Sequence, residues 1–309
     1  MTEQLPPDVI AKLTGMDSAI TPELVATSWS LLKPFHDKAG YQAPKIDRDQ
    51  RYGPHERHRL DVHTSGEVDG GVDGEEGGAQ ERVPVLVFVH GGGFIGGDKV
   101  VPGTPQYDHI GAWAVRNGWV GVTITYRLAP EHTWPAGARD VAAAVQWVRD
   151  HIAAYGGDPA RIVVAGHSAG CVHVASFLVG QGGGNLDGIS GAGLLSGFYQ
   201  IPDGAERGPL EAAYFGTRPS AEVSTLPGLL RSGVPLIFAI AERDPRFSQG
   251  QVAGLTAAWY AAKGEVPHVI YSAGHNHISQ IGSVGVDELA MGAQLARFVN
   301  RVTDRVTGR

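Results

Sequence analysis

The chain has 309 residues, a formal net charge of −7 at pH 7 and 42% hydrophobic residues. This length suits one large α/β domain or two small ones, and the composition is that of an ordinary globular protein. The negative charge disfavours a partner held through phosphate contacts, so we expect no nucleic-acid partner. The single cysteine, Cys171, excludes an internal disulfide and a cysteine-rich metal site.

The sequence shows no secretory or membrane signal. The first residues lack the basic and apolar regions of a signal peptide. No window approaches the roughly 18 uninterrupted apolar residues that a membrane-spanning helix needs. We therefore expect a cytoplasmic protein without a membrane span. The oligomeric state stays open, a homodimer included.

The N-terminal part predicts a helix, two strands and a loop, in that order. Apolar side chains recur at helical spacing over residues 22–38, and two short antiparallel strands are expected over 48–52 and 59–63. Residues 64–82 are rich in glycine and acidic side chains, which predicts a solvated surface loop. The acidic residues of this loop lack the spacing of a calcium-binding loop.

From residue 85 onward, apolar runs typical of buried parallel strands alternate with helical patterns. This alternation predicts a series of βαβ units in one sheet. A segment rich in proline and glycine, residues 198–230, interrupts the series and is expected to lie over the top of the sheet. The predicted strands cover residues 85–89, 119–126, 162–165, 189–196, 235–240 and 266–271, and the predicted helices 138–152, 171–179, 248–263 and 283–303.

Residues 166–170 read Gly-His-Ser-Ala-Gly and lie between a predicted strand and a predicted helix. A G-x-S-x-G sequence on a sharp strand-to-helix turn exposes the serine hydroxyl on a strained backbone, and a Cβ at either glycine would clash in the turn. A serine in this position is activated when a base lies within hydrogen-bond reach. The motif therefore predicts a serine hydrolase with Ser168 as its nucleophile.

A glycine-rich loop, His-Gly-Gly-Gly at residues 90–93, directly follows another predicted strand. Backbone N–H groups of such a loop can stabilise a developing oxyanion. We predict that Gly92, Gly93 and Ala169 form the oxyanion hole. His90 is expected to brace the loop rather than to take part in catalysis.

The acid and the base are sought further along the chain, because this topology orders the triad as serine, acid and histidine. Asp244 is preferred over Glu242 as the acid, since the following Pro245 fixes a turn that lets the carboxylate project from the strand end. His275 and His277 are both expected in the loop before the last helix. We favour His277 as the base, with His275 as the alternative.

Four segments carry a resemblance to a known family. They are HGGGF at residues 90–94, YRLAPEH at 126–132, GHSAG at 166–170 and Asp244 with its following proline. On these motifs the chain resembles the hormone-sensitive-lipase and carboxylesterase group of α/β-hydrolases, from about residue 45 to its end. The resemblance implies an α/β-hydrolase fold, hydrolysis of carboxylic esters through an acyl-serine intermediate, and a lid built from N-terminal helices.

Two positions depart from the lipase-like pattern. His167 precedes the serine where those members usually have aspartate, and residues 274–277 read Gly-His-Asn-His where they usually have one histidine followed by Gly-Phe. Both variants look closer to feruloyl-esterase-like and arylformamidase-like members. The acyl group and the leaving group of the substrate therefore stay open.

The expected architecture is an eight-stranded, mostly parallel sheet flanked by helices, with a small cap. Residues 1–44 are predicted to form an N-terminal cap segment and residues 45–309 the catalytic domain, with 198–230 as a cap-like insertion. The expected partner is a small-molecule ester with a small or medium acyl or aryl group. No cofactor and no metal are expected.

Three aromatic residues, Trp29, Phe94 and Phe198, are predicted to line the substrate pocket. Arg127 follows a buried strand and is expected to pair with Asp140 beneath the site. Two alternatives to an esterase remain. An arylformamidase would use the same residues on an N-formyl amide, and a non-catalytic binding protein would use the fold without an intact triad.

Overall fold

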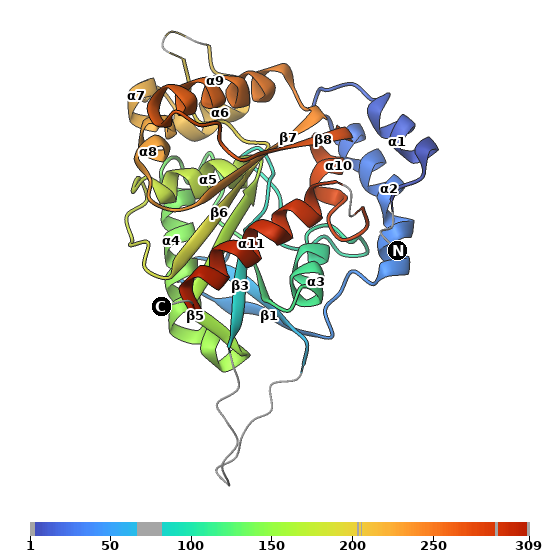
Figure 1. The fold of residues 1–309 in the computed structure, drawn as a ribbon. Helices are drawn as coiled ribbons and strands as arrows, with labels where there is room; N and C mark the ends of the chain where they lie inside the picture. Colours follow the sequence, from blue (N-terminus) through green and yellow to red (C-terminus); the bar gives the residue numbers. More distant parts are fainter. Residues whose placement is uncertain (1–3, 67–81, 203, 205, 288–289, 308–309) are drawn as a thin grey trace.

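The structure is a computed structural model, drawn as a ribbon in Figure 1. The described residues are 4–66, 82–202, 204, 206–287 and 290–307. Most of the predicted surface loop at 64–82 lies outside the described residues. Within the described part of the chain, no helix is both long enough and apolar enough to cross a bilayer.

Eight strands form one sheet in the order β1-β2-β4-β3-β5-β6-β7-β8. β2 runs antiparallel to both its neighbours, and all pairs from β4 to β8 along the sheet are parallel. The predicted eight-stranded, mostly parallel sheet is confirmed. The strands are β1 (Lys45–Arg51), β2 (Arg59–Thr64), β3 (Val83–Val89), β4 (Val120–Ile124), β5 (Gly157–His167), β6 (Ile189–Leu195), β7 (Leu236–Arg243) and β8 (Val269–Asn276).

The strand order reverses at β3, because β4 lies on one side of it and β5 on the other. In open α/β sheets a ligand binds at such a switch point, beyond the carboxyl ends of the strands. The order of the strands thus places the candidate site at the ends of β3 and β5.

Helices cover both faces of the sheet, which explains the uninterrupted apolar runs in the strands. One apolar core joins alternate strand residues to α4, α5, α8 and α9, and a second core joins the other strand residues to α3, α10 and α11. The helices are α3 (Asp108–Arg116), α4 (Ala136–His151), α5 (Ala169–Leu178), α8 (Leu226–Arg231), α9 (Arg246–Lys263), α10 (His277–Gly282) and α11 (Met291–Thr307), with a short 3₁₀ turn at Ile152–Tyr155.

Two further groups of helices lie near the carboxyl ends of the strands (Figure 1). At the N-terminus, α1 (Pro7–Thr14) precedes α2 (Pro22–Ala39), which confirms the helix predicted over 22–38. Trp29 of α2 packs against Ile278 of α10. The segment 198–230 contains α8 and two other short helices, α6 (Pro209–Phe215) and α7 (Ser220–Val223).

The helix predicted over 283–303 begins later than expected, because α10 ends at Gly282 and α11 starts only at Met291. Gly285 has φ +84°, which is incompatible with a continuing helix. The strand predicted over 266–271 begins later and continues to Asn276, pairing with β7 as far as that residue. The expectation that His275 and His277 share a loop is therefore wrong. His275 belongs to β8, and His277 is the first residue of α10.

Candidate active site

Ser168 stands between β5 and α5 with φ 56° and ψ −121°, a strained conformation for a residue with a side chain. Its N–H donates a hydrogen bond of 2.9 Å to the carbonyl of Leu195. A Cβ at Gly170 would collide with the carbonyl oxygen of Val89, and one at Gly166 would collide with the carbonyl of Gly170. The sharp turn therefore needs both glycines of the motif.

The glycine-rich loop lies beside this turn because β3 and β5 are neighbours, with Val89 opposite Gly166. Gly92 has φ +139° and Gly93 φ +60°. Ala169 is the first residue of α5, so its N–H has no acceptor within the helix. These three predicted oxyanion donors line the same pocket as Ser168.

His90 holds the start of this loop. Its Nδ1 lies 2.6 Å from the carbonyl oxygen of Gly91, and its ring stacks on Tyr126 at 4.4 Å. Burial lowers the pKa of His90 to about 3, so the ring is neutral at neutral pH. Below the site, Arg127 Nη2 lies 2.7 Å from Asp140 Oδ1, which confirms the predicted pair.

Asp244 directly follows β7 and is fully buried. Its Oδ1 lies 2.5 Å from His277 Nδ1, and its Oδ2 accepts hydrogen bonds of 2.7 Å from the hydroxyl of Ser196 and the N–H of Ala241. Burial by itself would raise the pKa of Asp244, but His277 and the two other donors outweigh it, and the pKa is lowered. Asp244 is therefore an ionised acceptor at neutral pH.

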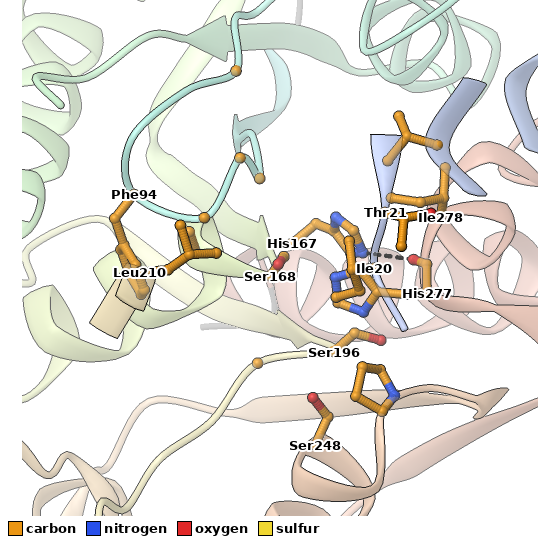
Figure 2. Close-up of a pocket in the computed structure, with 18 of the residues that line it drawn as sticks. Ile20, Thr21, Phe94, His167, Ser168, Ser196, Leu210, Ser248, His277 and Ile278 are labelled. Carbon is orange, nitrogen blue, oxygen red and sulfur yellow. Dashed lines mark hydrogen bonds between the residues drawn. The ribbon is translucent and has the colours of Figure 1, made fainter. Parts of the chain in front are cut away.

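The two candidate bases have different surroundings. His277 is bonded to the acid through Nδ1, and its buried Nε2 has no hydrogen-bond partner among the described residues. Figure 2 shows the side chains of His277 and Ser168 at the same cavity. His275 Nδ1 instead lies 3.2 Å from Ser279 Oγ, and its Nε2 lies 3.8 Å from Asp287 Oδ2. The geometry thus joins His277 to Asp244, and not His275.

The alternative acid, Glu242, is used elsewhere. Its Oε2 accepts a hydrogen bond of 2.8 Å from the backbone N–H of Gly274. It therefore fixes the backbone of β8 rather than a histidine ring.

Two polar residues near the acid and base were not assigned a role from the sequence. His167 Nε2 lies 2.9 Å from the carbonyl oxygen of His277, the contact dashed in Figure 2. Burial is the main cause that lowers the pKa of His167 to about 3, and the neighbouring His277 lowers it further. The ring is therefore neutral and donates a hydrogen bond to that carbonyl. Ser196 follows β6 at the same edge as Asp244. Its place at the carboxyl end of the strand predicted over 189–196 was the signal that could have identified it.

The site opens into a cavity of about 1210 Å³ that contains Ser168 and His277 in its wall. Trp29, Phe94 and Phe198, the three predicted pocket residues, all line it. Its other apolar lining residues include Ile20, Val25, Ile95, Ile201, Leu210, Phe247 and Ile278. A concave, largely apolar cavity with a few polar groups is typical of a binding site for a small organic molecule, and this volume has room for one of drug size or larger.

Among the described residues, Asp61, His63 and Asp108 form one group with the spacing of metal ligands. Arg48 Nη1 lies 2.7 Å from Asp61 and 2.6 Å from Asp108, and Lys99 Nζ lies 2.9 Å from Asp61. The two carboxylate charges are thus already balanced by two cations. This donor set fits a buried ion-pair cluster rather than a metal centre.

Comparisons with known proteins place these motifs among esterases. Residues 75–191 match the family model described as BD-FAE, a segment that includes the glycine-rich loop and Ser168. The chain is 45% identical over 92 residues to carboxylesterase NlhH of Mycobacterium tuberculosis, which covers 29% of this chain and 27% of that protein. It is 34% identical over 125 residues to esterase LipC of the same organism, and this match covers 40% of this chain and 27% of LipC. The chain thus spans about a quarter of the length of these curated relatives.

Solved structures resemble the chain over nearly its whole length. A bacterial heroin esterase superposes with a TM-score of 0.66 at 20% identity and covers 97% of this chain and 98% of its own. An esterase of Pyrobaculum calidifontis superposes with a TM-score of 0.63 at 22% identity, covering 98% and 99%. At this level of identity the likeness establishes the fold, and the predicted fold class is confirmed.

Proposed function

We propose that this chain, which has the α/β-hydrolase fold, is a carboxylesterase that cleaves esters with small or medium acyl or aryl groups. One observation carries the proposal. Ser168 on its strained turn shares a cavity with a histidine whose Nδ1 is bonded to a buried carboxylate and whose Nε2 is unpartnered. The names of the relatives, carboxylesterase and esterase, agree with it.

The mechanism has two acyl-transfer steps. His277 Nε2 takes the proton of Ser168, whose Oγ attacks the ester carbonyl. The tetrahedral oxyanion is stabilised by the N–H groups of Gly92, Gly93 and Ala169. His277 then gives its proton to the leaving alcohol, and a water molecule repeats the sequence to release the acid. Asp244 fixes the tautomer of His277 and stabilises its cation.

A cap over the catalytic domain is part of the proposal. Residues 1–44 and 198–230 would form it, and residues 45–309 would supply the catalytic machinery. Both cap segments contribute to the cavity wall, the first through Trp29 and the second through Phe198 and Leu210. Substrate size would therefore be set by segments that lie outside the strand ends.

The test is covalent labelling of the purified chain with a fluorophosphonate, combined with hydrolysis of 4-nitrophenyl acetate. The wild type is expected to be labelled stoichiometrically and to turn over the ester, and Ser168→Ala is expected to lose both. Ser248→Ala, another serine of the cavity wall, is the matched control and should retain both. Absence of labelling in the wild type would overturn the proposal. Faster turnover of N-formylkynurenine than of the ester would assign the site to formamides.

A further inference from the structure

A buried chain of polar side chains ends on the carboxylate of Asp244. Ser196 Oγ lies 2.7 Å from Asp244 Oδ2 and 2.5 Å from the side-chain amide of Gln280. The other atom of that amide lies 3.1 Å from Ser272 Oγ. These four side chains are at most 2% exposed, so their hydrogen bonds must be satisfied within the protein.

The number of available hydrogens decides which side chain donates and which accepts in each of these hydrogen bonds. A serine hydroxyl has one hydrogen, so Ser196 cannot donate to the carboxylate and to an amide oxygen at once. The ionised Asp244 is the stronger acceptor. The amide oxygen of Gln280 would then face Ser196 Oγ without a hydrogen between them. A half-turn of the amide places its NH₂ group toward Ser196 and lets its oxygen accept from Ser272.

We infer that Ser196 is a positioning residue for the proposed acid–base pair, and that Gln280 and Ser272 orient its hydroxyl toward Asp244. In this arrangement Ser272 donates to Gln280, Gln280 donates to Ser196, and Ser196 donates to Asp244. All three hydrogen bonds thus run in the same direction, from Ser272 toward the carboxylate of Asp244. The inference rests on the proposed function, because it concerns the strength of the bond between Asp244 and the proposed base.

The backbone holds Ser196 in this role. Its N–H donates a hydrogen bond of 2.9 Å to the carbonyl of Ala239 in β7, the strand that Asp244 directly follows. Its φ of 49° lies in the left-handed region, where a β-branched residue is disfavoured. Gln280 lies on α10, one turn after His277, so the same short helix carries the proposed base and the group that orients Ser196.

The hydroxyl of Ser196 has a defined electrostatic effect. A donor to the carboxylate withdraws negative charge from it and weakens its hold on the proton of the His277 cation. Without that donor, Asp244 would stabilise the charged imidazole more strongly, and the acid limb of a pH–rate profile that requires the neutral base would move to higher pH. If Ser196 only held the structure together, its loss would loosen the contact between Asp244 and His277. The charged imidazole would then be less favourable, and the acid limb would move to lower pH instead.

The experiment compares the pH dependence of kcat/KM on 4-nitrophenyl acetate in the wild type and in Ser196→Ala. We expect the acid limb of the profile to move to higher pH by about one unit, with a loss of about tenfold in kcat/KM at acidic pH. Ser190→Ala, which removes a β6 hydroxyl that contacts the carbonyl of Ala160 outside the cavity, should leave the limb in place. An unmoved limb in Ser196→Ala, or a shift to lower pH, would overturn the inference.

A second variant, Gln280→Met, keeps the volume and removes the amide. It should move the acid limb in the same direction as Ser196→Ala but by less, because Ser196 keeps its hydroxyl and loses only its orientation. A shift to lower pH would show that the amide oxygen competes for the hydrogen of Ser196, which contradicts the inferred direction. If Ser196→Ala does not fold, this variant carries the test. A wild type without fluorophosphonate labelling would refute the proposed function, whereas a labelled wild type with unmoved profiles refutes this inference alone.

Discussion

The turn at residues 166–170 and the base segment formed by β8 and α10 meet at the same cavity but are built in different ways. The turn is made by five consecutive residues whose conformation follows from two glycines and the strand and helix beside them. In the base segment, His275 and His277 are the same residue type two positions apart, yet one of them alone is bonded to Asp244. The conformation of the turn therefore follows from its own sequence, whereas the choice between the two histidines depends on the residues packed around them.

Three backbone carbonyls of α10 contact buried histidines from three other elements. His167 of β5 contacts the carbonyl of His277 at 2.9 Å, and His36 of α2 contacts that of Gly282 at 2.7 Å. His109 of α3 lies 3.0 Å from the carbonyl of Ile281. A six-residue helix is not stable in isolation, so its position depends on such contacts.

The largest expected effect separates the two histidines. His277→Ala should lower kcat by about 10⁴-fold or more, because a triad without its base retains little more than binding and oxyanion stabilisation. His275→Ala removes a buried ring that contacts Ser279, so we expect a lower Tm with activity within about tenfold of the wild type. Steady-state kinetics of both variants on one ester decides the point. Equal losses in both would break the distinction between the two residues.

The second effect tests the acid. Asp244→Asn keeps the shape of the side chain but removes its charge, and we expect a loss of about 10⁴-fold in kcat with near-normal KM. The variant should still fold, which circular dichroism would check. The matched control is Glu242→Gln, which changes the carboxylate bonded to Gly274 and should retain most of the activity. If Glu242→Gln lost as much activity as Asp244→Asn, the assignment of the acid would be wrong.

The sequence predicted what depends on local pattern and on burial. The apolar runs predicted the strands because both faces of the sheet are covered. The order of motifs placed Ser168, Asp244 and His277 after strands of one sheet, at the same edge. The strand-end position of Ser196 is a local signal, but its contact with Gln280 could not be predicted, because it joins residues 84 positions apart. The end of β8 and the break before α11 likewise depend on pairing with β7 and on a turn without a strong local signal.

The third prediction tests the local encoding of the turn. Gly170→Ala introduces a Cβ that collides with the carbonyl oxygens of Val89 and His90, which are backbone atoms of β3 and the glycine-rich loop. We expect a loss of roughly 3 kcal/mol or more in the free energy of unfolding, together with most of the activity. Gly250→Ala on α9 meets no atom within 4 Å and should instead leave stability unchanged or raise it by up to about 1 kcal/mol. Denaturant unfolding of both variants measures the contrast, and a stable, active Gly170→Ala would contradict it.

The smallest effect concerns the support of the base segment by His36. Burial lowers the pKa of this residue to about 4, whereas an unfolded histidine titrates near 6.5. Between these two values the unfolded chain binds one more proton than the folded chain at this site, so acidification removes stability there, and the full contribution is present above pH 6.5. His36 should account for a slope of about 1.4 kcal/mol per pH unit in the free energy of unfolding. His36→Gln and His36→Leu should both remove this slope, measured by denaturant unfolding between pH 7.5 and 4. Only His36→Leu should also lose stability at pH 7.5, because glutamine keeps an N–H donor for the carbonyl of Gly282. An unchanged slope in both variants would mean that His36 is not neutral in the fold, and the support of α10 would then be a charged contact.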